Sequence, residues 1–440
     1  MKVRLKTIFS ISVFAAAPFP MSISFGGLNG AYFYELIVIA CFFLLIFNGG
    51  VVREVRSTIR SAGLFDIFRV GGVFIFFSLF GVGYSFFETA FSNLGYESTQ
   101  LKMIAHVLIS LLLLSGALVC GFTLFNGTQD LKYVSYLVVI AIFSMSLLVL
   151  YEWITVTGMS FSRYNFDPPT GLGQGDTAKM LLLGVTVSCS LLHTEKLFIN
   201  RVVLTLVLIT LSIACLTIQS RASYFLFFFM AFMMGFLSLQ NLNGHRRRLA
   251  TLGLSLSSLV LLGMMAQYIS SSFIVVSSVS IASDSQNLEQ LNKLVVIGEA
   301  MGMFFENIFL GIGMGMFGLF TKAEMTFASG AAAVTVASPH NGVAQLLAEG
   351  GIIGFSLFSI LLFKVFSSLH RIFKLKFSSE VYFHNRILLL FLYSVLGLSI
   401  FFGSHLLPPL TQRDAMRIAF YLWFLIGFSL SFLKREPSYK

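Results

Sequence analysis

A histidine followed by an asparagine ends the longest polar stretch of this chain, in the sequence Ser338-Pro339-His340-Asn341. We predict that Ser338 caps a helix and that Pro339 takes its first position, since a serine hydroxyl accepts from orphan amides and proline has no amide to satisfy. His340 then lies in the first turn, where free amides and the helix dipole attract phosphate and keep an imidazole neutral. Such an imidazole is a candidate general base; the alternative is an interfacial histidine without a chemical role.

Arg221 is the second candidate, in the sequence LTIQSRASYF, where a very short polar turn separates two apolar segments. An arginine at or below the membrane surface is costly unless it reaches the headgroups or binds an anion. Its planar guanidinium makes paired hydrogen bonds and therefore suits a diphosphate. The alternative is an arginine that only extends to the interface.

Further cations lie in two other polar segments, Arg163 before the turn-forming sequence YNFDPPTGLGQGDTA, and Arg413 and Arg417 in TQRDAMR. Glycine, proline, asparagine and aspartate favour turns, so the first segment is predicted to be a loop. Each arginine is either a substrate-binding group or an ordinary anchor at the membrane interface.

The elements that must position these residues are membrane helices. Hydrophobic residues make up 57% of the chain, charged residues only 11%, and mean hydropathy is +0.88, far from the soluble average of about 25% charged residues. Apolar runs of about 20 residues recur throughout and predict an all-α polytopic protein with about 12 transmembrane helices. We place them at 7–25, 31–48, 67–87, 101–125, 133–155, 177–194, 202–219, 222–240, 249–276, 343–363, 387–403 and 416–433, in a single domain covering 1–440.

The basic residues predict the orientation of these spans. With the N-terminus in the cytoplasm, cytoplasmic segments hold 21 of the 29 lysines and arginines, and the other side holds 13 of the 19 acids. The positive-inside rule is therefore satisfied, and both termini are predicted to be cytoplasmic. Topology accounts for the net charge of +10, so nucleic acid is not needed as a partner.

One loop is much longer than the others, at 277–341 between spans nine and ten on the external side. Within it, Leu294, Ile297, Met301, Phe304, Phe305 and Ile308 recur at helical spacing. This helix suits either the membrane interface or packing against neighbouring helices. The following glycine-rich segment 311–318 lacks the preceding strand of a dinucleotide-binding motif. It is predicted to be a turn that lets the backbone approach closely to either a ligand or a helix.

The sequence lacks the residues that several kinds of chemistry require. The sequence has no GxxxxGK[ST] loop for ATP, no DxD pair, no HExxH and no His/Cys cluster for zinc, so we expect neither a cofactor nor a metal. The four cysteines lie in apolar runs and are expected to be buried small hydrophobes. An enzyme of this composition needs an activated substrate, with cations to stabilise the leaving group.

The order of these motifs resembles the O-antigen ligase and polymerase superfamily. The resemblance rests on Arg163 with GLGQGDTAKMLLLG, then IQSRASYFL, FFENIFLGIGMGMF and SPHNGVAQLLAEGGIIGF, together with span number and the place of the long loop. Its most specific part is His340-Asn341 followed by Glu349, Gly351 and Gly354 leading into a span. It implies GT-C-like architecture in the bacterial inner membrane and an active site in the periplasm.

The resemblance further implies glycan transfer. The donor is a polysaccharide on undecaprenyl diphosphate; the acceptor is a lipid A core sugar in a ligase, or a second lipid-linked repeat in a polymerase. By this analogy Arg221 holds the diphosphate, His340 is the base, and Asn341 and Glu349 help to form the substrate site. The reaction is expected to invert the anomeric carbon without metal. The short Arg221 turn, the Arg163 segment and the lack of a soluble C-terminal domain favour a ligase.

One position departs from the family pattern. The family usually has an arginine early in the helix before the glycine-rich turn, where this chain reads LNK, so Lys293 is the nearest cation. A lysine is a point charge and cannot bind in the paired geometry. Either Lys293 or another cation such as Arg417 takes this role.

A membrane transporter is the competing class. Twelve spans with both termini inside also describe many carriers, which hold their substrate near the bilayer midplane. The chain has no obvious internal repeat, and His106 is the clearest ionisable residue within a span. Sensitivity of His106, rather than of His340, to substitution indicates a carrier.

Overall fold

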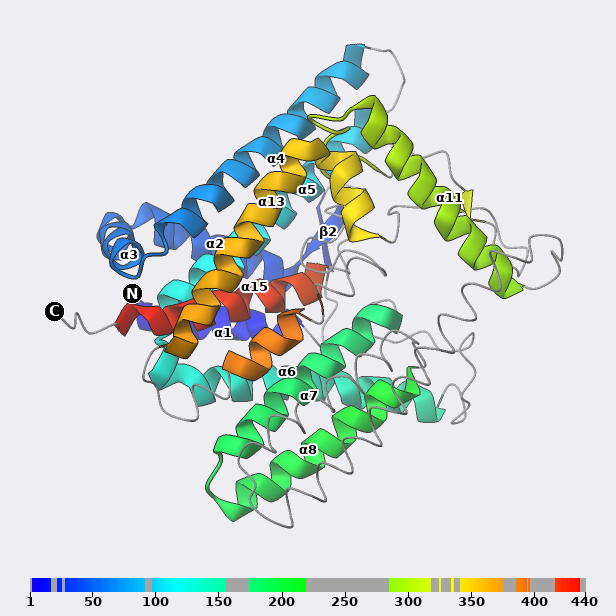
Figure 1. The fold of residues 1–440 in the computed structure, drawn as a ribbon. Coiled ribbons are helices and arrows are strands. Elements are labelled where there is room, and N and C mark those ends of the chain that lie inside the picture. Colours follow the sequence, from blue (N-terminus) through cyan, green and yellow to red (C-terminus); the bar gives the residue numbers. More distant parts are fainter. Residues whose placement is uncertain are drawn as a thin grey trace.

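A computed structural model of the chain describes residues 2–16, 22–25, 28–91, 97–155, 174–218, 285–317, 324–325, 334–335, 341–374, 385–393, 395 and 416–435. Its framework is helical (Figure 1). The helices are α1 (Lys2–Ala16), α2 (Phe33–Phe47), α3 (Gly49–Ser61), α4 (Phe65–Phe91), α5 (Glu97–Leu124), α6 (Gly127–Thr155), α7 (Gln174–Thr194), α8 (Phe198–Thr217), α11 (Ser285–Glu306), α13 (Gly342–Lys374), α15 (Met416–Leu430) and the 3₁₀ helix η2 (Ser431–Arg435). Two small antiparallel hairpins pair β1 (Ser22–Phe25) with β2 (Leu28–Tyr32), and β3 (Glu324–Met325) with β4 (Val334–Thr335).

Seven helices of the described residues are long and apolar enough to cross a membrane, in α4, α5, α6, α7, α8, α13 and α15 with η2. They coincide with seven of the twelve predicted spans, so the chain is a multi-pass membrane protein. Residues 385–393 are also helical, within the predicted eleventh span. The predicted spans 222–240 and 249–276 lie outside the described residues, and the number twelve stays a prediction.

The first two predicted spans are shorter than expected. The prediction that a helix runs to residue 25 is wrong, because α1 ends at Ala16 and Ser22–Phe25 is a strand paired with Leu28–Tyr32. Prolines at 18 and 20 lack the amide donors that a helix needs, and glycines at 26 and 27 favour turns. These residues explain why the apolar run does not continue as a helix. The apolar helix α2 begins only at Phe33.

The centre of the molecule is α15, each of whose residues is buried, and α5 is its principal neighbour (Figure 1). Glycines allow the two backbones to approach. A Cβ atom added at Gly121 of α5 would lie 2.5 Å from the carbonyl oxygen of Phe424, and one at Gly427 of α15 would collide with Leu118. Small residues at such crossings are the usual device for close packing of membrane helices.

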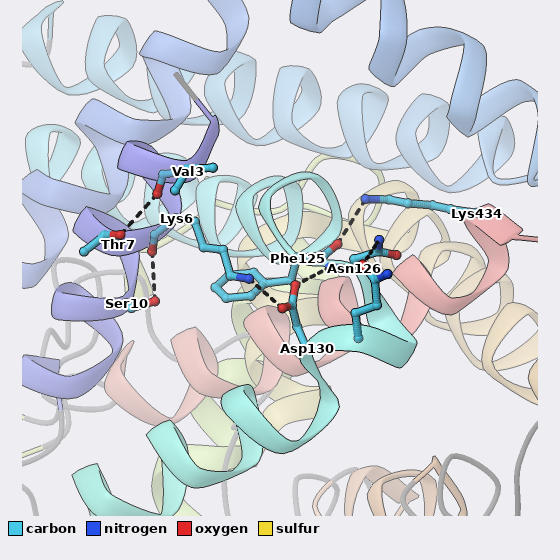
Figure 2. A network of polar contacts seen from close by, with 9 residues as sticks. Val3, Lys6, Thr7, Ser10, Phe125, Asn126, Asp130 and Lys434 are labelled. Carbon is cyan, nitrogen blue, oxygen red and sulfur yellow. Dashed lines mark hydrogen bonds and ion pairs between the residues drawn. The ribbon is translucent and has the colours of Figure 1, made fainter.

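A set of polar contacts joins segments that the predicted topology places on one side. Lys6 of α1 forms an ion pair of 2.6 Å with Asp130 at the start of α6, and Lys434 donates to the carbonyl of Phe125 over 3.2 Å (Figure 2). Elsewhere Lys364 of α13 pairs with Asp66 of α4 at 3.0 Å. The predicted spans, with the N-terminus in the cytoplasm, place all of these segments on the cytoplasmic side, and both termini lie at the same end in Figure 1.

Glu195, between α7 and α8, makes several polar contacts of this kind. Its carboxylate accepts hydrogen bonds from the Tyr136 hydroxyl at 2.8 Å and from the amides of Lys196 and Leu197, and Lys132 lies 3.5 Å away. Burial raises the pKa of Glu195, but the hydroxyl, the two amides and the lysine charge together lower it more, to about 2. The ionised carboxylate thus ties α6 to the turn before α8.

We expect Glu195→Gln to destabilise the purified protein by about 2 kcal/mol at neutral pH, because a buried charged acceptor is lost. A carboxylate with a lowered pKa contributes stability above its ordinary value of 4.5, and this contribution disappears as the pH falls towards about 2. The difference in melting temperature between wild type and variant should therefore narrow on acidification. Glu306→Gln, at an exposed carboxylate of α11, is the control; a difference that stays constant with pH would contradict the assignment.

Candidate active site

The beginning of α13 is built by Asn341. Its side-chain oxygen accepts from the amides of Val343 at 3.0 Å and Ala344 at 2.9 Å, and its carbonyl accepts from the amide of Gln345. Asn341 is therefore the N-cap, and the prediction that Ser338 caps this helix is wrong: α13 starts at Gly342. Asn341 caps the helix because its side-chain amide oxygen reaches the backbone amides of the second and third helical residues. His340 itself, immediately before this cap in the sequence, lies outside the described residues.

This capping changes the expected anion site. Two of the amides that we expected to attract phosphate already donate to Asn341. A diphosphate near the start of α13 therefore needs cationic side chains as its main partners, since the first helical turn has fewer amides to offer.

We expect Asn341→Ala to cost about 1 kcal/mol of stability, because the cap is lost, whereas Asn341→Asp should retain the cap. Melting temperatures in detergent test this difference. If the alanine variant melts like the wild type, the capping role is wrong. Transfer activity of the capped aspartate variant then measures any separate contribution of the amide group to substrate binding.

The first third of α13 is separated from the rest by a break at Gly351, which has φ +58° and ψ −165° (Figure 1). A break leaves backbone groups without helical partners, and inside a membrane such groups must be satisfied by protein. The glycine-rich turn after α11 supplies hydrogen-bond partners for these backbone groups. Ile312 and Gly313 donate to the carbonyls of Ala348 and Glu349, both over 2.9 Å, and Ile352 and Ile353 donate to the carbonyls of Ile308 and Phe309.

Glycine is required on both sides of this pairing. A Cβ added at Gly311, which has φ +68°, would lie 2.5 Å from the carbonyl of Glu349, and one at Gly351 would lie 2.7 Å from the amide nitrogen of Gly311. The prediction that segment 311–318 allows close backbone approach is confirmed, with α13 as the partner. A Gly350-Gly351 pair inside an apolar run is the sequence signal for this break, and our sequence analysis missed it.

The glycine-rich turn and the broken part of α13 together form a junction, and the side chain of Glu349 binds both of its parts. The carboxylate is buried and accepts from the amide of Phe317 at 3.3 Å and from the side-chain amide of Gln345 at 3.4 Å. In the structure Glu349 therefore joins the end of the glycine-rich turn to α13. Its predicted contact with substrate stays a prediction.

α11 completes this assembly by packing on the first part of α13. Val296 and Ala300 are buried against Ala344, Ala348 and Phe317, in a small cluster separate from the main core. Phe305, near the end of α11, and Phe309, just after it, remain 66% and 69% exposed. Packing on a neighbouring helix, one of the two uses that we left open for this helix, is thus present. A place at the membrane interface stays a prediction.

The remaining candidates are placed only in part. Arg417 is the second residue of α15 and is completely buried. Lys293 belongs to α11, but its side chain lies outside the described part of the structure. Arg163, Arg221 and Arg413 also lie outside it, so their predicted roles are proposals.

The fold and this junction define a class: a multi-pass helical membrane protein with a broken helix braced by a glycine-rich turn. Within that class, residues 206–359 match the family described as O-antigen ligase, and this match supports the O-antigen ligase and polymerase superfamily expected from the motifs. The matched segment includes Arg221, Lys293, His340, Asn341 and Glu349. The match supports O-antigen ligase or polymerase activity in general, and hence an enzyme of the glycosyltransferase kind. No protein with a curated description matches the chain.

Proposed function

We propose that the protein is an O-antigen ligase of the bacterial inner membrane. It moves a glycan from undecaprenyl diphosphate onto the lipid A core, at an active site on the periplasmic side, with both termini in the cytoplasm. The family match over 206–359 carries this proposal, because the segment holds both Arg221, which is proposed to bind the diphosphate, and His340, the proposed base. A polymerase that joins lipid-linked repeats is the second candidate, since the superfamily includes both activities.

The junction at α13 supports a site at this place. Broken membrane helices line the substrate sites of many membrane proteins, because only there can irregular backbone be tolerated. Asn341 caps the start of α13, directly after His340 in the sequence, and the Glu349 carboxylate binds the amide of Phe317 at the end of the glycine-rich turn. α11 lies on the side of the molecule away from both termini (Figure 1), which agrees with an external location for this region.

The proposed chemistry is a direct displacement. His340 takes the proton of the acceptor hydroxyl as its oxygen attacks the anomeric carbon, and the bond from that carbon to the diphosphate oxygen breaks. The leaving undecaprenyl diphosphate carries the developing negative charge, which Arg221 stabilises. Lys293, Arg163, Arg413 and Arg417 are proposed to assist in substrate binding.

A lipopolysaccharide gel from a strain lacking the gene tests the function. Core without any repeat unit supports the ligase, because nothing is then joined to the core. Core that carries a single repeat unit supports the polymerase, because joining continues while chain growth stops. An unchanged ladder would contradict both and return attention to the transporter.

We expect Arg221→Ala to reduce transfer by about 10³-fold, the usual cost of removing a charge-stabilising group from a transition state. Arg221→Lys should recover only part of the activity, because lysine keeps the charge but loses the paired hydrogen bonds. Complementation of the deletion strain, scored on the same gel with protein levels in the membrane, measures both. Full activity of the alanine variant would remove Arg221 from the site.

A further inference from the structure

An open cavity lies at the end of α5 that is near both chain termini, and the proposed function does not use it. Its volume is about 380 Å³, within the range of ligand pockets. It is lined by Lys2, Val55, Thr58, Phe122, Thr123, Leu124, Phe125, Asn126 and Lys434. Four segments far apart in the sequence therefore meet here: the N-terminus, α3, the end of α5 and the C-terminal η2.

The lining is positively charged. Lys2 and Lys434 contribute cations, and no carboxylate is among the described residues that line the cavity. The nearby carboxylate of Asp130 is neutralised by Lys6 at 2.6 Å and also accepts from the amide of Asn126 (Figure 2). Lys434 is held at the rim by the Phe125 carbonyl and by the ring of Phe122, 4.6 Å from its nitrogen. The cavity therefore favours an anion.

One wall of the cavity belongs to an amphipathic helix. Val55 and Thr58 of α3 line the cavity, and Ile59 is buried, whereas Arg53, Arg56 and Arg60 are exposed. A helix with an apolar face and a basic face lies in the membrane interface and attracts anionic lipids. The sequence analysis had treated this segment as a connection between spans.

The depth of the cavity agrees with the level of the headgroups. The lining residues 122–126 are those at which the membrane span Ala105–Leu124 ends. A ligand in this cavity therefore lies where lipid phosphate groups lie, and the basic face of α3 lies beside it.

We propose that this cavity binds the phosphate group of an anionic phospholipid, on the side of the membrane that carries both termini. Lys2 and Lys434 bind the phosphate, and α3 lies over the neighbouring headgroups. The inference does not depend on glycan transfer, since it rests on residues outside the O-antigen ligase match.

Native mass spectrometry of the purified full-length protein in neutral detergent tests the proposal. The protein is titrated with phosphatidylglycerol and, separately, with phosphatidylcholine of the same acyl chains. We expect one phosphatidylglycerol to bind preferentially. Because a basic residue near a charged surface contributes about 1 kcal/mol, Lys434→Gln should weaken this binding about fivefold, and the pair Lys2→Gln and Lys434→Gln about thirtyfold.

Lys364→Gln is the matched control. This lysine pairs with Asp66 and is not part of the cavity lining, so its loss removes the same charge and should leave lipid binding unchanged. Melting temperature and elution volume show whether each variant is folded. If the double variant is not folded, lipid binding by the Lys434→Gln variant alone tests the proposal.

Three results would overturn the proposal. The first is equal binding of phosphatidylglycerol and phosphatidylcholine by the wild type. The second is unchanged phosphatidylglycerol binding in the Lys434→Gln variant, or an equal loss in the Lys364→Gln control. The third is displacement of the lipid by millimolar inorganic phosphate, which would identify a free anion, rather than a headgroup, as the occupant.

Discussion

His340→Ala is expected to abolish glycan transfer while the protein still accumulates in the membrane. A general base contributes about 10²–10⁴-fold to a rate, and alanine removes the imidazole without replacing its function. The effect on folding should be small, because the N-cap of α13 is Asn341 and not the histidine. The expected gel is that of the deletion strain, with variant protein present at the wild-type level.

His106→Ala is the matched control for this experiment. His106 belongs to α5, in the span Ala105–Leu124, and has no role in the proposed transfer. A ligase should tolerate the substitution at position 106 and fail with the substitution at position 340. The reverse pattern would indicate a carrier with its substrate in the membrane, and normal activity of His340→Ala would remove this residue from the mechanism.

Gly351→Val is expected to be the most damaging substitution in the described part of the chain. Its φ of +58° with ψ of −165° is open essentially to glycine alone, so a branched residue is strained there at any packing. The added Cβ would also collide with the backbone of Phe309 and Gly311. Strain and overpacking together suggest a loss of about 2–5 kcal/mol, enough to reduce the amount of folded protein severely.

Gly302→Ala is the control for this prediction. Gly302 lies in α11, and a Cβ there would have no atom within 4 Å. Alanine favours a helix by up to about 1 kcal/mol over glycine, so this variant should melt at or above the wild-type temperature. Thermal unfolding in detergent, with membrane levels of both proteins, measures the pair. A Gly351→Val protein as stable as the control would mean that the break in α13 is not needed.

Hydropathy alone predicted the membrane helices well. Seven predicted spans coincide with long apolar helices of the structure, because apolarity over about 20 residues is a local property of the sequence. The same criterion failed at the N-terminus, where an apolar run of similar length is divided between α1 and the β1–β2 hairpin. It also missed α3, whose alternation of basic and apolar residues indicates a surface helix rather than a loop.

At the candidate site, too, the sequence predicted some features, and others depended on tertiary contacts. The composition of segment 311–318 predicted a turn with close backbone approach, and Glu349 and Asn341 were selected by resemblance to the family. Their observed contacts depend on residues distant in sequence or on the true start of the helix. Glu349 meets Phe317, and Asn341, rather than Ser338, caps α13. A pattern of residue types cannot choose between two good caps three positions apart.

The sequence by itself therefore predicted the class of the protein, seven membrane helices of the described structure and the superfamily that the match over 206–359 supports. These depend on composition, local apolarity and motif order, which need no knowledge of distant contacts. Only the tertiary structure decided that the glycine-rich turn satisfies the broken backbone of α13, and that four distant segments line an open basic cavity at the end of α5. Both arise because unsatisfied backbone groups and charges near a membrane must find partners, and which partners they find is fixed by how the helices pack.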